Sequence, residues 1–285
     1  CRPSGAPPDR LHGMTVVAVL SMKGGVGKST VALGLASAAW NQQRRTLLID
    51  LDPQANATRR LATRLPRNPE ARSAASLAAV LHRPRPGDAG RVIVPCGWPD
   101  PYPSHIDVAP AHLDLELLPA TAATPGASRR LLTALTGVSA AYDLVLIDCP
   151  PSLRGHLVDM AWTATDMVFI PCEPEYDSIE AARRVIERVD LDRDLLNPDL
   201  QVGGLVCTRY RHPLGLHQQR RVEMRSVLGP GSVCPWTVPE LTLLKSVSEL
   251  ATPLALLASG GSMAVLARDM LAWMLRRHAL LTAVA

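Results

Sequence analysis

Lysine is scarce in this sequence. The chain has 30 Lys and Arg residues together, yet the only lysines among them are Lys23, Lys28 and Lys245. Arginine supplies the positive charge nearly everywhere else. Lysine carries a compact point charge, whereas arginine carries a planar, forked one. Arginine therefore cannot replace lysine at a site that requires a compact charge. Because Lys23 and Lys28 fall within one short stretch, we expect that stretch to be a site that requires lysine.

Long apolar runs and paired cysteines are also absent. No segment reaches the roughly 18 uncharged apolar residues of a membrane span, and the six cysteines show no C-x-x-C or zinc-ligand spacing. Cys149, Cys172 and Cys207 lie in or beside apolar, strand-like runs, which favours buried free thiols and a cytoplasmic protein. With 285 residues and 47% hydrophobic content, the chain can form one large α/β domain or two small ones.

The lysine-containing stretch is Ser21–Thr30, which is rich in glycine and lies between two apolar runs. Residues 15–20 predict a strand and residues 31–40 predict a helix. Strand, glycine loop and helix form the context of a phosphate-binding loop, in which backbone N–H groups converge on phosphate oxygens at the start of the helix. In this interpretation Lys28 reaches the β- and γ-phosphates and the Ser29 hydroxyl completes a Mg²⁺ shell. The alternative is a glycine-rich turn with chance basic residues, and the flanking strand and helix argue against it.

The loop departs from the usual pattern G-x-x-x-x-G-K-[ST] at one position, since Met22 stands where the first glycine belongs. The sequence here is Lys-Gly-Gly-x-Gly-Lys-Ser, which resembles the deviant phosphate loop of the ParA/MinD family of ATPases. The resemblance implies that ATP is bound with Mg²⁺ and that Lys23 reaches across a dimer to the partner's nucleotide. The loop residues that it assigns to ATP are Lys23, Gly24, Gly25, Val26, Gly27, Lys28, Ser29 and Thr30.

A second motif follows residues 45–50, which predict another buried strand. Asp50 and Asp52, two positions apart just past its end, point to the same side, and ligands bind at that end of open α/β sheets. The segment Asp50–Thr58 resembles the family's D-x-D-P-Q-G-N-A-T and differs only at Ala55. The resemblance implies that Asp52 orients the attacking water and that Asp50 supports the metal region. A simple capped turn is the alternative.

The apolar run Tyr142–Asp148 predicts a strand that ends in an aspartate, which is the pattern of a Walker B element. Asp148 is expected to hold Mg²⁺ through water. The tail D-C-P-P-S-L at 148–153 resembles the family's switch segment residue for residue. Without that tail, a buried strand ending in a capping aspartate would be a reasonable alternative.

Strands alternate with helical runs along the rest of the chain, which favours βαβ units. We predict an α/β fold with a single doubly wound, mostly parallel sheet flanked by helices, as in P-loop NTPases of the deviant Walker A type. Residues 1–13 are expected to form a disordered extension, 14–278 the ATPase domain and 279–285 a tail. Further strands are predicted at 105–111, 201–210 and 233–239, a strand with its exit loop at 166–176, and helices at 128–139, 178–189, 216–228 and 262–278.

The segment 63–104 is rich in proline and is expected to be a surface excursion that could serve as a partner site. One short helix is predicted in it, at 73–82. Trp98 and Tyr102 could form an exposed anchor, but we expect them to cover the edge of the core.

Two later segments resemble the family's base-binding region. Thr208-Arg209-Tyr210 ends a predicted strand and also occurs in MinD-type members near the adenine, and Pro239 matches the proline of the family's adenine loop. The resemblance therefore adds Thr208, Arg209 and Pro239 to the expected ATP contacts. The family's Arg-Asn after this proline is Glu240-Leu241 here, which favours looser selectivity for the base.

The resemblance covers residues 14–278. It implies a ParA-like ATPase that dimerises on ATP–Mg²⁺, binds DNA without sequence preference, and drives plasmid or chromosome partitioning with a ParB-like partner. Hydrolysis would be slow, stimulated by the partner and achieved by positioning and charge neutralisation. We expect a cytoplasmic, nucleoid-associated homodimer. The residues that carry the function are Lys23, Lys28 and Asp52 for catalysis and Ser29, Asp50 and Asp148 for the metal.

Two alternatives belong to other classes. One is a membrane-surface positioning ATPase like MinD, for which the amphipathic run 262–278 would be the membrane helix. We favour docking of this helix on the sheet, because MinD-type tails are short and basic whereas residues 279–285 are neutral. The other alternative is a non-hydrolysing scaffold, and an intact Asp52 argues against it.

The net charge of +4 permits DNA binding without requiring it. Residues 173–199 are strongly acidic, whereas 200–231 are basic. In the predicted helix 216–228, Arg221 and Arg225 are four residues apart and share a face. The proposed DNA contacts are Arg220, Arg221 and Arg225, and a solvated helix face is the alternative.

Overall fold

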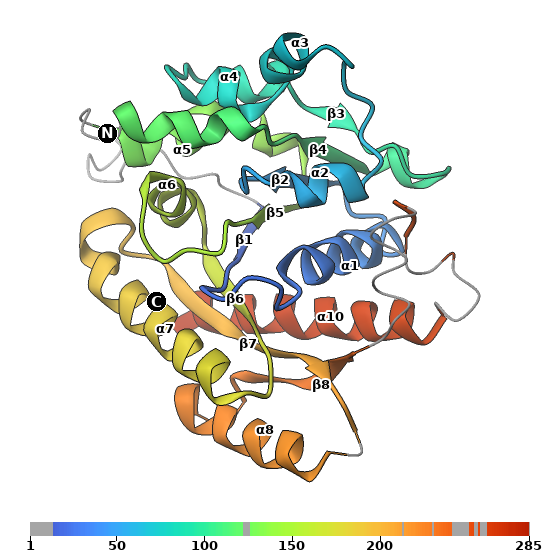
Figure 1. Ribbon diagram of the computed structural model, residues 1–285, viewed down its shortest axis with the longest axis vertical. Coiled ribbons are helices and arrows are strands. Elements are labelled where there is room, and N and C mark those ends of the chain that lie inside the picture. Colours follow the sequence, from blue (N-terminus) through green and yellow to red (C-terminus); the bar gives the residue numbers. More distant parts are fainter. Residues whose placement is uncertain are drawn as a thin grey trace, which may run out of the picture.

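The computed structural model describes residues 14–121, 126–212, 214–229, 231–240, 251–253, 256 and 261–284. The strands of this part of the chain form one sheet (Figure 1). They are β1 (Thr15–Val19), β2 (Thr46–Asp50), β3 (Val94–Pro95), β4 (Ile106–Ala109), β5 (Leu144–Asp148), β6 (Met167–Cys172), β7 (Gln201–Tyr210) and β8 (Val233–Pro239). Their order is β3-β4-β2-β5-β1-β6-β7-β8, and every neighbouring pair is parallel except β3 and β4.

Helices cover both faces of the sheet (Figure 1). They are α1 (Lys28–Trp40), α2 (Asn56–Arg60), α3 (Pro69–Ala74), α4 (Leu77–Leu81), α5 (Arg130–Leu135), α6 (His156–Ala164), α7 (Tyr176–Leu196), α8 (Gly215–Leu228) and α10 (Gly261–Val284). The predicted fold class, a doubly wound and mostly parallel sheet flanked by helices, is confirmed.

The central strands place alternate side chains in two separate cores. In β1, Val16 and Ala18 face the core formed with α4, α5, α6 and α7. Val17 and Val19 face the other core, formed with α1 and α10. Burial on both sides is what a central parallel strand requires, and it explains why β1 is continuously apolar rather than alternating.

The last helix, α10, lies along α1 and buries its apolar face there, with Met270, Leu271 and Met274 inside the core. Gly34 of α1 faces Ala267 of α10 at this contact, and a Cβ on Gly34 would lie 3.7 Å from the Cβ of Ala267, in ordinary van der Waals contact. Docking of this helix on the fold, favoured from the sequence, is confirmed, and the helix continues past His278 to Val284.

All seven predicted strands are present. Six of them end within two residues of the predicted bounds, and the one predicted with its exit loop at 166–176 spans Met167–Cys172. The short strand β3 was not predicted, because a pair of residues is too short to show a periodic pattern. It pairs antiparallel with β4 at the edge of the sheet, which is where a strand tolerates a proline such as Pro95.

The prediction of a single helix at 73–82 is wrong. The structure has two helices there, α3 and α4, because Ser76 adopts an extended conformation with φ −129° and ψ 168°. The Ser76 hydroxyl donates to the carbonyl of Ser73 at 2.7 Å. The first of the two helices starts earlier than predicted, at Pro69, and is capped by the Asn68 side chain. Helices α2 and α6 were not predicted, and α7 is longer at both ends than the predicted 178–189.

Trp98 and Tyr102 are buried, with 4% and 3% of their surface exposed. The Tyr102 ring centroid lies 5.5 Å from that of Trp98 and 4.8 Å from that of Trp40. The prediction that these side chains cover the core edge is therefore confirmed. The predicted disordered extension, residues 1–13, lies outside the described residues. Among the described helices, none combines the length and the apolar character needed to cross a bilayer.

Candidate functional site

The parallel register of β1, β5 and β2 brings three motifs to one edge of the sheet. Asp148 is level with Val19 on one side and with Asp50 on the other. The carboxyl ends of these strands therefore deliver the glycine loop, the Asp50–Asp52 turn and Asp148 to the same place. A cleft of about 930 Å³ opens there. Its lining comprises Gly24, Gly25, Gly27, Lys28, Ser29, Thr30, Asp52, Gln54, Asn56, Arg59, Arg60, Pro151 and Ala251.

The glycine loop has the backbone that a phosphate cradle needs. Gly25 and Gly27 have φ of 78° and 93°, in the left-handed region that other residues rarely adopt. A Cβ at Gly24 or Gly25 would have no neighbour within 4 Å, so this side of the loop is open. Helix α1 begins directly after Gly27, and its first backbone N–H groups have no partner within the helix. Anions bind at such helix starts.

Lys28 is the buried cation of the cleft, with 7% of its surface exposed. Burial lowers the pKa of its ammonium group, while the nearby carboxylates of Asp148 and Asp52 act to raise it. A lysine held in this way has a strong electrostatic reason to bind phosphate oxygens. Val26, also predicted at ATP, has a fully buried side chain, so only its backbone is available to a ligand.

Asp148 is the candidate ligand for a cation in this site. Its side chain is fully buried, and neither carboxylate oxygen has a hydrogen-bond partner among the described residues. Burial raises the pKa of Asp148, although the nearby Ser29 hydroxyl and Lys28 ammonium oppose the rise. A bound Mg²⁺ would favour the ionised form. These donors therefore fit the ion predicted from the sequence.

The metal would be held together with a ligand rather than by protein alone. Among the described residues, no group of three or more His, Cys, Asp or Glu side chains could hold a metal ion. Mg²⁺ in nucleotide sites keeps several waters and takes only one or two protein ligands plus phosphate oxygens. Ser29, which lines the cleft, and Asp148, which lies directly beside Ser29, suffice for that arrangement.

Asp50 is occupied within the protein. One of its oxygens accepts hydrogen bonds from the backbone N–H and the hydroxyl of Thr58, both at 2.7 Å. The other accepts from the backbone N–H of Asp52 at 3.2 Å. Burial and the negative charge of Asp148 raise the pKa of Asp50. These contacts hold the turn after β2 in place, so any support that Asp50 gives to the metal is indirect.

Asp52 lines the cleft opposite the glycine loop and is 7% exposed. One oxygen, Oδ1, accepts a hydrogen bond from the backbone N–H of Gln54 at 3.0 Å. This fixes the carboxylate while leaving it on the wall of the cleft, as a residue that orients water requires.

Lys23 is not brought together with the other loop residues. It lies outside the lining of the cleft, and its ammonium group contacts Glu173 Oε2 at 2.8 Å and Glu175 Oε2 at 2.5 Å. These contacts raise the pKa of Lys23. Neither acidic partner was predicted from the sequence, although both follow a predicted strand at the edge of the sheet where ligands bind.

The three residues predicted to contact the adenine base also lie outside the lining of the cleft. Thr208 is 1% exposed and lies under the glycine loop, since a Cβ on Gly27 would come within 3.9 Å of its methyl group. Arg209 binds Glu173 at 2.9 Å and Glu240 at 3.2 Å. Pro239 ends β8 beside Tyr210. Most of the predicted adenine loop, from residue 241 to 250, lies outside the described residues.

The fold and the cleft define a P-loop nucleotide-binding protein, with a glycine loop before α1 and an aspartate at the end of the neighbouring strand. A family model described as an AAA domain matches residues 14–202. Chromosome partitioning protein ParA of Myxococcus xanthus is 31% identical over 210 residues, which are 74% of this chain and 70% of that protein. Together these matches show that the chain belongs to the ParA family of partition ATPases.

Two further relatives support the assignment. Sporulation initiation inhibitor protein Soj of Bacillus subtilis is 34% identical over 199 residues, which are 68% of this chain and 72% of that protein. The structure of cobyrinic acid a,c-diamide synthase from Mycobacterium smegmatis with bound ADP and magnesium is similar, with a TM-score of 0.69 and 26% identity. That similarity covers 84% of this chain and 92% of the other.

Proposed function

We propose that this protein is a ParA-like ATPase that binds ATP–Mg²⁺ in the cleft, dimerises around the bound nucleotide and hydrolyses it slowly. The observation that carries the proposal is the proximity of Lys28 and Asp148 at the start of α1, where each affects the pKa of the other. One is a buried cation suited to phosphate, and the other is a buried carboxylate with two free oxygens suited to a metal. Asp52 stands on the opposite wall of the same cleft.

Each residue has a defined task in the reaction. Backbone N–H groups of the glycine loop and the Lys28 ammonium neutralise charge on the phosphates. The Ser29 hydroxyl and Asp148 would hold Mg²⁺, which supplies further charge neutralisation when bound. Asp52 orients the attacking water, and its bond from the Gln54 backbone fixes the direction of the carboxylate.

Dimerisation is proposed to depend on Lys23. In the single chain its ammonium is held by Glu173, which is buried, and by Glu175, which is exposed. For Lys23 to reach a partner's nucleotide it must leave these carboxylates, and phosphate groups would replace them as counter-ions.

Lys23→Ala is therefore expected to bind ATP with normal affinity and to remain a monomer, as measured by light scattering with ATP–Mg²⁺. Glu175→Gln is the matched control, because it removes only the exposed carboxylate, and exposed ion pairs contribute about 1 kcal/mol or less. That control should dimerise as the parent does. Normal dimerisation of Lys23→Ala would contradict the role across the dimer.

DNA binding without sequence preference, and release stimulated by a ParB-like partner, complete the proposal. The three predicted arginines of α8 do not form one open face. Arg220 pairs with Glu223 at 2.6 Å and lies over the ring of Tyr176. Arg221 donates to the carbonyl of Pro235. Only Arg225 is exposed, so DNA would have to draw the other two away from their present partners.

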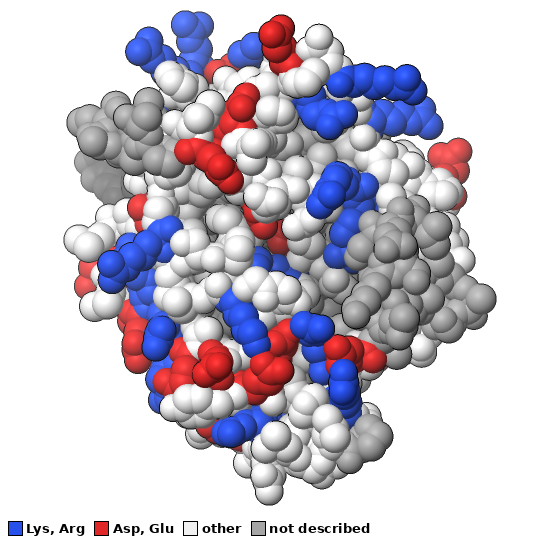
Figure 2. All heavy atoms as spheres, viewed as in Figure 1, with Lys and Arg blue, Asp and Glu red and all other residues white. Residues whose placement is uncertain are grey.

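A second basic surface exists on the described chain. Figure 2 shows positive and negative side chains mixed over α7 and α8, whereas positive ones prevail at the upper right edge, beside α3. Seven exposed arginines lie between residues 59 and 91, against the acids Glu70 and Asp88. They are Arg59, Arg64, Arg67, Arg72, Arg83, Arg85 and Arg91.

Replacing Arg220, Arg221 and Arg225 by alanine is expected to weaken binding to any duplex and to flatten its salt dependence. For each phosphate that the variant no longer neutralises, the slope of log affinity against log salt should fall by roughly 0.9. ATP turnover without DNA should not change. Fluorescence anisotropy at several salt concentrations measures both the affinity and its salt dependence.

The matched comparison is a triple alanine variant at Arg64, Arg67 and Arg72, which removes the same charge from the other basic surface. Unaltered affinity in the α8 variant, together with weaker binding in this one, would move the DNA face to α3. If the parent bound no DNA with ATP at low salt, the DNA part of the proposal would be refuted.

A further inference from the structure

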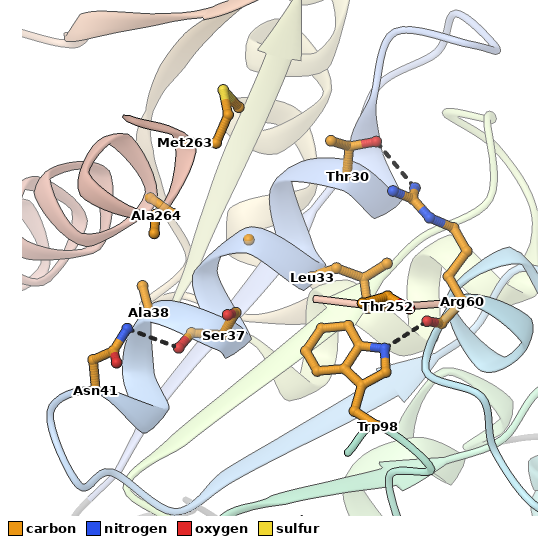
Figure 3. A pocket seen from close by; sticks show the side chains of 12 residues that line it. Thr30, Leu33, Ser37, Ala38, Asn41, Arg60, Trp98, Thr252, Met263 and Ala264 are labelled. Atoms are coloured by element: carbon orange, nitrogen blue, oxygen red, sulfur yellow. Dashed lines mark hydrogen bonds between the residues drawn. The ribbon is translucent and has the colours of Figure 1, made fainter. Parts of the chain in front are cut away.

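Arg60, at the end of α2, is held at two points, both drawn in Figure 3. It lines the cleft and also the small neighbouring pocket that the figure shows. Its backbone carbonyl accepts a hydrogen bond from the indole N–H of the buried Trp98 at 2.7 Å. Its Nη1 donates to the hydroxyl of Thr30, in the first turn of α1, at 3.0 Å. The guanidinium is thereby fixed beside the residue that follows the phosphate loop.

The charge of this guanidinium is not balanced within the described chain. No carboxylate of the described residues lies within 4 Å of it, and its Nε is buried without a hydrogen-bond partner. Burial lowers the pKa of Arg60, and the more distant Asp148 opposes this only in part. Arginine nevertheless remains charged in proteins. A partly buried charge without a carboxylate partner is costly, so the arrangement favours an anion from outside the chain.

We infer that Arg60 binds a phosphate oxygen that ADP and ATP have in common. This inference rests on the proposed binding of nucleotide in the cleft. Lys28, Asp148 and Asp52 mark the place of the terminal phosphates and the metal. Arg60 is tied instead to Thr30, one position beyond the metal-binding hydroxyl of Ser29. With Nη1 on Thr30 and Nε buried, the planar guanidinium still offers Nη2 as a donor, and charge-assisted hydrogen bonds from arginine to phosphate are among the strong ones.

The test compares the affinities of ADP–Mg²⁺ and a non-hydrolysable ATP analogue by calorimetry. Arg60→Ala should weaken both ligands by about tenfold or more, because each of them loses a hydrogen bond to a charged group. Arg60→Lys should fall between the parent and Arg60→Ala, since it keeps the charge but not the fork. Arg64→Ala, at an exposed arginine four residues on, should bind as the parent does. Unchanged ADP affinity in Arg60→Ala would overturn the inference, and so would a loss confined to the ATP analogue.

A stability measurement separates ligand binding from a structural role. Arg60→Met removes the unpaired charge but keeps an unbranched side chain of similar reach. Without nucleotide, its thermal unfolding midpoint should equal or exceed that of the parent, while the upward shift caused by ADP–Mg²⁺ should shrink. A lower midpoint without nucleotide, combined with the full shift by ADP, would show that Arg60 only supports the fold.

Failure of the proposed nucleotide binding and failure of the role of Arg60 give different results in this experiment. If the parent bound neither ADP nor the ATP analogue, the proposed function would be wrong. If the parent bound both and Arg60→Ala bound them equally well, only the role of Arg60 would be wrong.

Discussion

Lys28→Ala is expected to lower ATP affinity by roughly a hundredfold or more, which corresponds to about 3 kcal/mol for the loss of a buried, charge-assisted hydrogen bond. Lys28 is the only lysine in the lining of the cleft formed by the described residues. The other cations in that lining, Arg59 and Arg60, are hydrogen-bonded to Asn56 and Thr30 and cannot take over its position in the glycine loop. Calorimetry with ATP–Mg²⁺ measures the loss.

Lys28→Arg is the sharper variant, because it preserves the charge and changes only its shape. The ammonium is buried between the loop and two aspartates, which leaves little room for a planar fork. We expect this variant to bind ATP nearly as poorly as Lys28→Ala does. Far-UV circular dichroism should show that both variants are folded. ATP affinity like that of the parent in Lys28→Arg would refute the role given to Lys28.

Asp52→Ala is expected to reduce ATP turnover by roughly a hundredfold or more, the usual loss when a group that positions or activates water is removed. Nucleotide binding should persist, because the only hydrogen bond of the Asp52 side chain among the described residues is the one that it accepts from the backbone N–H of Gln54. Asp52→Asn keeps the shape of the side chain and should be almost as slow. Turnover by either variant at the rate of the parent would show that Asp52 is not the residue that orients water.

Much of the fold could be predicted because its signals are local. The strands of the central sheet are short apolar runs bounded by polar residues, and they were found almost to the residue. The break between α3 and α4 escaped prediction because it depends on one residue, Ser76, leaving the helical conformation. Helix α2 was not predicted because it overlaps the motif Asp50–Thr58, which was interpreted for its chemistry rather than for its structure.

In the site too, residues in local motifs could be predicted, whereas contacts between distant residues could not. Lys28, Ser29, Asp52 and Asp148 stand in contiguous motifs, and the parallel register brings their motifs together as predicted. The contact of Lys23 with Glu173 joins residues 150 positions apart, and no local pattern indicates it. Arg60 was missed for a different reason. It lies two residues beyond the second motif, but its lack of a counter-ion is visible only once its surroundings are known.

The central claim is that ATP–Mg²⁺ bound in this cleft drives dimerisation. The most direct test is the mass in solution of Asp52→Ala, measured by size-exclusion chromatography with light scattering, in ATP–Mg²⁺ and in ADP–Mg²⁺. Because this variant should bind ATP without hydrolysing it, it should accumulate in ATP at twice the chain mass of 30.6 kDa and remain a monomer in ADP. A monomer in saturating ATP would contradict the account.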